Sequence, residues 1–407
     1  SFNVAVGHLA GENVTTGTFN TLIGGLAGDA LTTGQQNVAL GYNALGAEDT
    51  GNKSVAVGIS ALASQNNDDN NFNVAVGHQA GFSITTGTIN TLIGGLAGDA
   101  LTSGNSNVAV GYQALSADTT GDRSTALGFQ ALAVQNFATN ADVYNVAVGY
   151  NAGVSVTTGD SNTLIGGLSG DALTEGTDNT AVGTAALSAD TLGSGSVAIG
   201  KNALISQNFT TATTAYNVAV GRSAGAAVTT GVNNTLLGGL AGDALTSGNS
   251  NVALGYVSLS ADTLGDRAVA LGYGALNQQN FATTTDNYNV GVGYSAGLSI
   301  TTGIQNALLG GVAGDSLTDA DNNVAVGYAA LTSDTLGSKS VAIGKSALQS
   351  QNFTTATDSF NVAVGASAGL NVTTGLNNTI VGGLAGDALT EGFANQLFGY
   401  GAGGSLT

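Results

Sequence analysis

The chain has 407 residues, 64 of them glycine, and it contains no proline, cysteine, methionine or tryptophan. A hydrophobic fraction of 43% is too high for a disordered chain, and the absence of cysteine excludes disulfides and thiolate metal sites. The formal net charge of −19, with seven lysines and arginines in all, argues against nucleic acids and anionic membranes as partners, because both attract basic surfaces.

The first predicted element is a short strand at residues 3–7, Asn-Val-Ala-Val-Gly, which is rich in β-branched residues and ends at a glycine. A second short strand is expected around the Ala-Leu positions that follow such a glycine. No segment has a helical period, and none approaches the roughly 18 unbroken apolar residues of a transmembrane helix. The sequence therefore predicts an all-β chain of very short strands.

This pattern recurs at a nearly constant spacing. The first 70-residue repeat divides into four units, three of 17 residues and a fourth of 19, which grows to 21 in later repeats. These units are residues 2–18, 19–35, 36–52 and 53–71. The long repeats are residues 2–71, 72–143, 144–215, 216–287 and 288–359, followed by a partial repeat at 360–407. They give 23 units, which we expect to form a single repeat rod over residues 1–407.

The lack of hairpin turns indicates how the strands pair. The chain has no Asn-Gly dipeptide, which two-residue hairpins favour. We therefore expect one coil per unit, with each strand paired to its equivalents in neighbouring coils, which is a parallel β-solenoid or β-roll. At about 4.8 Å per coil, 23 coils predict a rod of roughly 110 Å.

Two columns of residues carry this interpretation. Asn3, Asn20 and Asn37 share one column, and stacked amides of this kind can form hydrogen-bonded ladders along a stack of strands. Within the strand, Val4 and Val6 point to one face and Ala5 to the other, so both faces are apolar. One face is expected to fill the core, and the other is free to meet neighbouring chains, which favours an oligomer.

Several units resemble a known family. Ser-Val-Ala-Ile-Gly followed by two residues and Ala, at residues 196–204 and 340–348, is similar to the head repeats of trimeric autotransporter adhesins, the YadA-like left-handed β-roll. Asn-Val-Ala-Val-Gly-Tyr-Asn-Ala-Gly, at residues 145–153, resembles the same repeat in phage tail-fibre-like proteins. The resemblance extends over nearly the whole chain, although these units are longer than the usual repeat. It implies a homotrimer of left-handed rolls presented on a cell or virion.

A glycine-rich loop with one aspartate occurs once in each long repeat. The segment Gly-Gly-Leu-Ala-Gly-Asp-Ala-Leu-Thr differs at one fixed position from the calcium-binding nonapeptide. Its aspartates are separated by four coils, too far to share an ion, so we expect them to cap turns, with calcium as the alternative. They are Asp29, Asp99, Asp171, Asp243, Asp315 and Asp387.

Other polar residues indicate no chemistry. His8 and His78 share a column that later holds Tyr, Arg and Ala, so we expect an exposed position. There is no thiol and no histidine paired with a recurring serine and acid, so no catalytic, cofactor-binding or metal-ligating residue is predicted and an enzyme is not expected. The threonine pairs that begin with Thr15-Thr16 and Thr32-Thr33 favour turns, with an ice-binding face as an alternative.

The fourth unit breaks the pattern in a regular way. It carries a basic residue before the strand at Lys53, Arg123, Arg267 and Lys339, and it ends in a longer loop with Gln-Asn-Phe. This loop is expected to bulge from the stack, with its phenylalanine packed inside or used for a lateral contact to a glycan or another strand of a fibre.

Taken together, these features predict an extracellular fibre shaft or head that is structural, adhesive and non-enzymatic. It would lie on a cell surface or virion, associate with copies of itself, and attach to a surface glycan or host receptor through repeated contacts. A head-to-tail filament subunit and an ice-binding solenoid are the alternatives.

Overall fold

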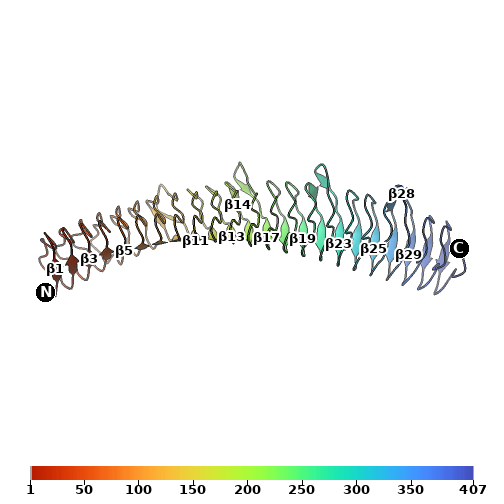
Figure 1. Ribbon diagram of the computed structural model, residues 1–407, viewed down its shortest axis with the longest axis horizontal. Coiled ribbons are helices and arrows are strands. Elements are labelled where there is room, and N and C mark those ends of the chain that lie inside the picture. Colours follow the sequence, from red (N-terminus) through yellow and green to blue (C-terminus); the bar gives the residue numbers. More distant parts are fainter. Residues whose placement is uncertain (1, 407) are drawn as a thin grey trace. The chain divides into compact units, whose positions relative to one another are not determined.

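The structure is a computed structural model that describes residues 2–406. The chain winds as an all-β, parallel β-solenoid of about 23 coils, each with one three-residue strand in the main ladder (Figure 1). This confirms the predicted fold class. No helix in the part of the chain that the structure describes is long and apolar enough to cross a membrane. The handedness of the coil and the number of chains stay predictions.

The described chain forms two compact units. One contains the residues up to Lys201 with Asn208–Thr214, and the other contains Asn202–Gln207 with the residues from Ala215 onward. In the first unit the ladder strands are β1 (Val4–Val6), β2 (Thr21–Ile23), β3 (Val38–Leu40), β4 (Val55–Val57), β5 (Val74–Val76), β6 (Thr91–Ile93), β7 (Val108–Val110), β9 (Thr125–Leu127), β11 (Val146–Val148), β12 (Thr163–Ile165), β13 (Thr180–Val182) and β15 (Val197–Ile199). In the second they are β17 (Val218–Val220), β18 (Thr235–Leu237), β19 (Val252–Leu254), β21 (Val269–Leu271), β23 (Val290–Val292), β24 (Ala307–Leu309), β25 (Val324–Val326), β27 (Val341–Ile343), β29 (Val362–Val364), β30 (Thr379–Val381) and β31 (Gln396–Phe398).

Within each unit, every ladder strand pairs in parallel with the strand of the next coil. Val4 lies opposite Thr21 at the start of the first unit, and Val252 lies opposite Val269 in the second. The register therefore places equivalent positions of successive repeats side by side. The columns found in the sequence thus become columns in space.

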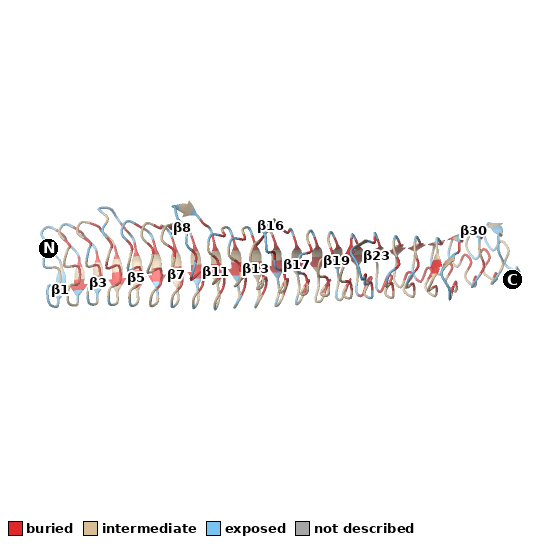
Figure 2. Cartoon of the chain, turned by 90° about the horizontal axis from the view of Figure 1, so that it is seen from above, coloured by how far each residue is buried: buried red, intermediate tan, exposed pale blue. Residues whose placement is uncertain are grey.

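The strands alternate between a buried and an outward-facing column. The middle residue is buried, as Ala39 and Ala253 show, while Leu40 and Leu254 on the outer face are 43% and 45% exposed. The core is built mainly from alanine and leucine, because a coil of 17 residues encloses little space. Figure 2 shows buried residues along the ladder strands and exposed residues in the turns.

The predicted second strand is wrong. The Ala-Leu positions lie in turns, and Leu45 and Leu115 both have a φ of 54° in the left-handed region. Each leucine is buried by this corner, because the left-handed residue turns the chain back across the core. Burial of an apolar side chain at each corner offsets the cost of the unusual backbone.

The additional strands in the described chain join the end of a third coil to the end of the longer fourth coil that follows it. They form two-residue parallel pairs that project from the coils (Figure 1). The pairs are β8 (Gly121–Asp122) with β10 (Ala141–Asp142), β14 (Gly193–Ser194) with β16 (Thr213–Thr214), β20 (Gly265–Asp266) with β22 (Thr285–Asp286), and β26 (Gly337–Ser338) with β28 (Thr357–Asp358). The expected bulge is therefore present, and Phe209, Phe281 and Phe353 are packed inside it, each 5% exposed.

The asparagine column forms a hydrogen-bonded ladder, but most of its hydrogen bonds join a side chain to the backbone rather than one side-chain amide to another. The Asn20 Oδ1 atom accepts from the Asn37 backbone N–H at 2.9 Å. The Asn20 Nδ2 donates to the Gly34 carbonyl of its own coil at 2.8 Å. Each side chain therefore closes its coil and also links it to the next, which explains why the buried position needs both an acceptor and a donor.

Candidate functional site

The outer face of the ladder is an aliphatic surface that repeats from coil to coil within each unit. The third residue of each three-residue ladder strand before the last is Val, Ile or Leu, and the strands are adjacent within each unit. Val6 is 58% exposed, and Ile93 and Leu309 are 40% and 41% exposed. Contiguous exposed apolar surface is typical of an interaction surface rather than of a monomer's solvent face.

A second feature is a cluster at the corner where the fourth coil meets the next repeat, found in four of the five full long repeats. The Arg267 guanidinium forms an ion pair with Asp286, and its carbon Cζ lies 5.6 Å from the centre of the Tyr288 ring. Arg123 makes the same contacts with Asp142 and Tyr144. All the side chains in these two ion pairs are about half exposed, so the pairs contribute little to stability.

Two further corners repeat this arrangement with lysine. The Lys339 Nζ atom lies 2.6 Å from Asp358 Oδ2 and 5.2 Å from the centre of the Phe360 ring. Lys53 lies over Phe72 at 5.0 Å. The sequence singled out these four basic residues because they occupy the same position in their repeats. In the structure, each of them lies over an aromatic ring. The predicted lateral contact itself stays a prediction.

A third feature is a column of exposed aromatic side chains directly after the glycine that ends each ladder strand. Tyr112, Phe129 and Tyr150 stack with ring centroids 5.7 and 5.5 Å apart. In the second unit, Tyr256 stacks on Tyr273 at 5.8 Å, and Tyr273 stacks on Tyr294 at 5.3 Å. The rings stack because parallel strands bring equivalent residues of successive coils together.

The two histidines belong to this aromatic column. His8 and His78 are exposed, as predicted, and they lie in separate long repeats. Among residues 2–406, no group of three or more His, Cys, Asp or Glu side chains is placed to hold a metal ion.

The aspartates of the glycine-rich loops cap turns only in part, because the carboxylates of Asp99, Asp171 and Asp243 each bond to their own backbone N–H through one oxygen only. One carboxylate oxygen of Asp29, Asp99, Asp171 and Asp243 is buried without a hydrogen-bond partner. Burial raises the pKa of the Asp99 carboxyl and likewise the pKa of Asp171 and Asp243. Asp315 differs, since its Oδ1 accepts from the Thr332 hydroxyl. In the equivalent place Ser116 donates to the Ala133 carbonyl, and the Asp99 Oδ1 atom has no partner.

A different set of carboxylates caps the turns, and sequence reasoning missed it. Asp262 is fully buried, and its Oδ1 accepts from the Gly265 N–H at 3.0 Å while Oδ2 accepts from Gln279 Nε2 at 2.5 Å. Gln279 Oε1 in turn accepts from Asn289 Nδ2 at 2.9 Å. The sequence does contain a pattern that could have revealed this set, which is an acidic residue three positions before a glycine in the third coil of each full repeat.

Glu48 makes the same network in the first repeat. Its Oε1 accepts from the Gly51 N–H at 2.7 Å, and its Oε2 accepts from Gln65 Nε2 at 2.8 Å. Burial raises the pKa of Glu48 and of Asp262, although the hydrogen bonds to each carboxylate oppose that rise. The network joins two coils and the asparagine column, so its role is structural.

The threonine column lies in turns. The Thr85 hydroxyl donates to the Thr102 carbonyl at 3.2 Å, and the Thr102 hydroxyl donates to the Thr119 carbonyl at 2.9 Å. These hydroxyls thus link successive coils instead of forming the outer face of the ladder.

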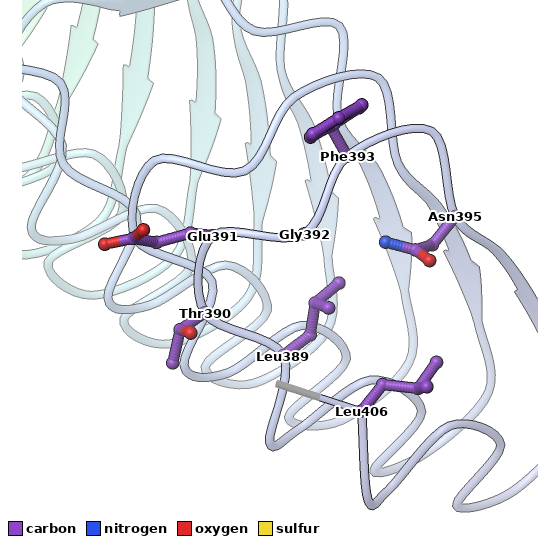
Figure 3. Close-up of a pocket in the computed structure, with 7 residues that line it drawn as sticks. All are labelled: Leu389, Thr390, Glu391, Gly392, Phe393, Asn395 and Leu406. Atoms are coloured by element: carbon purple, nitrogen blue, oxygen red, sulfur yellow. The ribbon is translucent and has the colours of Figure 1, made fainter.

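A hollow at the last coils has a volume of about 520 Å³. Figure 3 shows its lining side chains, which are Leu389, Thr390, Glu391, Gly392, Phe393, Asn395 and Leu406. In earlier coils the corresponding space is filled by the loop of the following coil, as the Cβ position of Gly375 against the Gly392 carbonyl shows. We therefore assign no ligand to it.

Comparison with known proteins adds no family. No model of a protein family matches the chain, and no curated protein sequence is similar to it. The likeness to YadA-like head repeats and to tail-fibre repeats therefore depends on the residues quoted above.

Proposed function

We propose that the chain is the shaft or head of an extracellular fibre, built by self-association of parallel β-solenoids and used for attachment. The observation that carries the proposal is the outer face of the ladder, an aliphatic stripe that is partly exposed along each unit. A homotrimer would bury this stripe, in keeping with the resemblance to YadA-like rolls.

The remaining surface fits attachment better than catalysis. Ring clusters occur in four of the five full long repeats, and several weak contacts together give high avidity without a single deep site. The net charge of −19 keeps such a surface from associating without specificity. The proposed location is a cell surface or a virion, and the proposed partner is a surface glycan or receptor.

Self-association can be tested by placing lysine on the outer face. Leu237, Leu271, Leu309 and Ile343 lie on alternate strands, so four lysines there are not adjacent in the ladder. A matched control places four lysines at Thr283, Thr284, Thr354 and Thr355, which are exposed in the projecting loops. Circular dichroism verifies that both variants keep their β structure.

We expect the face variant to sediment as single chains and the loop variant to keep the native mass. A glutamine version of the face variant separates loss of apolar contact from added charge. Equal masses for the native chain and for both variants would overturn the proposal. Growth of native particles into long filaments with concentration would favour the head-to-tail alternative.

A further inference from the structure

A glycine interrupts the exposed aromatic column once in each long repeat. The other positions of the column hold residues with a side chain, such as Tyr42, Ile59 and Phe129. The interrupting residues are Gly25, Gly95, Gly167, Gly239, Gly311 and Gly383. Each lies in the second coil of its repeat and leaves a gap between the side chains of the coils before and after it.

Neither backbone nor packing requires glycine at these positions. Their φ values lie outside the left-handed region, unlike those of the strand-ending glycines beside them. A Cβ at Gly239 would lie 3.4 Å from the Tyr256 ring, and at Gly95 it would lie 3.6 Å from the Tyr112 ring, which are ordinary contacts. The side chain is therefore absent without a structural need, and its absence keeps the gap open.

One of these gaps forms a measurable hollow. It has a volume of about 210 Å³ and is lined by Arg222, Ser223, Gly239, Leu240 and Tyr256, all in the second unit. Tyr273 stacks on the face of Tyr256 that points away from Gly239. The opposite face of the Tyr256 ring therefore borders the hollow, across the Gly239 coil from Arg222.

The spacing of the walls suits one ring. Arg222 and Tyr256 belong to coils separated by the Gly239 coil, which places their backbones about 9.6 Å apart at the usual strand spacing. A ring that contacts a group on each side needs about 7–8 Å, twice the optimal separation of carbon atoms. One sugar or aromatic ring fits, and two stacked rings do not.

The charges of the walls indicate the ligand. Arg222 forms no ion pair within the described chain, whereas Arg123, Arg267 and Lys339 each have an aspartate partner. A guanidinium binds a carboxylate through two parallel hydrogen bonds, and a tyrosine ring presents an apolar face with a polar tip. We propose that this hollow binds a pyranose ring that carries a carboxylate, such as a uronic acid unit of an extracellular polysaccharide.

This inference rests on the proposed attachment function and names its ligand class. The equivalent gaps have different walls, for example Tyr294 and Tyr328 beside Gly311. Only the gap at Gly239 has arginine as a wall. A polysaccharide that spans four coils, about 19 Å, reaches the next gap and gains from a second contact.

The test follows Tyr256 directly in the full chain. The protein is labelled with 3-fluorotyrosine, and the Tyr256 fluorine resonance is assigned by its loss in Tyr256→Phe. The probes are tri-galacturonic acid and the same trisaccharide with its carboxylates reduced to alcohols. We expect a saturable shift with the acidic probe and an at least tenfold weaker affinity for the reduced probe.

Matched variants separate the hollow from general charge. Arg222→Gln is expected to weaken binding of the acidic probe at least tenfold, while Lys345→Gln, the same charge change at an exposed residue that borders no glycine gap, leaves it unchanged. Gly239→Leu fills the hollow and is expected to abolish the shift with either probe. Thermal melting shows whether each variant is folded.

Three results would overturn the inference. The first is a Tyr256 signal that does not respond to either probe. The second is an equal response to both probes that survives Arg222→Gln. The third is a shift that depends on protein concentration alone, which would place a second copy in the hollow. Chain mass is measured separately, so single chains that bind the acidic probe would contradict the fibre and leave the hollow intact.

Discussion

At the scale of the residue, the buried carboxylates show that stability is uneven along each repeat. Asp262 is buried with a full set of hydrogen bonds, whereas Asp243 has a buried oxygen without a partner. Replacing the carboxylate by a neutral amide is therefore expected to change stability in opposite directions at the two positions. At Asp262 it removes an acceptor that has hydrogen-bond partners, whereas at Asp243 it removes a buried acceptor that has none.

Asp262→Asn is expected to lower the free energy of unfolding by about 1–3 kcal/mol. The new amide places an NH₂ group against Gln279 Nε2, and turning Gln279 over only moves the clash between donors to Asn289. Asp243→Asn is the control and is expected to leave stability unchanged or raise it. Chemical denaturation measures both. A larger loss for Asp243→Asn than for Asp262→Asn would contradict this account.

Acid is expected to stabilise the fold as pH falls from neutral toward about 4. Burial raises the folded-state pKa of Glu48 and Asp262, and also of Asp99, Asp171 and Asp243. The folded chain therefore binds these protons more tightly than the unfolded chain, whose carboxyls titrate near about 4. The stabilisation is fully present below that value and is lost as pH rises through the raised folded values.

Thermal melting in one buffer series checks this. Tm should rise as pH falls from 7 to about 4, and reduced repulsion among the excess negative charges acts in the same direction. A Tm that falls over this range would show that the buried carboxylates are stabilised mainly as anions.

At the scale of the element, each coil depends on two kinds of glycine. Gly255 ends its strand with a φ of 141°, and a Cβ there would lie 2.4 Å from the Gly272 carbonyl oxygen. Gly239 has room for a Cβ. The first kind is a requirement of coil stacking, and the second is available for function.

Gly255→Ala is accordingly expected to cost about 3 kcal/mol or more, because the clash is with backbone in the next coil. Gly239→Ala is expected to be neutral or to stabilise by up to about 1 kcal/mol, since alanine restricts the unfolded chain. Urea denaturation of both variants measures the two changes in the free energy of unfolding. Similar losses in the two variants would mean that Gly239 also is needed by the fold.

Sequence reasoning predicted the strand, the coil and the register, because these follow from a repeated pattern. It failed at the corners, where Leu45 was assigned to a strand although its backbone is left-handed. Propensity cannot reveal this, since leucine is uncommon in that conformation and adopts it here to reach the core. The pairing of Asp262 with Gln279 was missed because the two residues are 17 apart and meet only through stacking.

At the scale of the whole molecule, repetition makes a surface that no single coil possesses. A partly exposed valine or leucine is common in one strand, but the ladder repeats it along each unit. The single repeat rod, its handedness and the number of chains stay predictions. What the ladder supports is the proposal that its outer face associates with other copies.

The most direct test of this proposal is the mass of the native chain in solution, measured by sedimentation together with electron microscopy of the same sample. The account predicts discrete elongated particles that contain more than one chain, with three as the expected number. Single chains of 39.5 kDa that stay monomeric at high concentration would contradict it, because the aliphatic stripe would then face water in every coil.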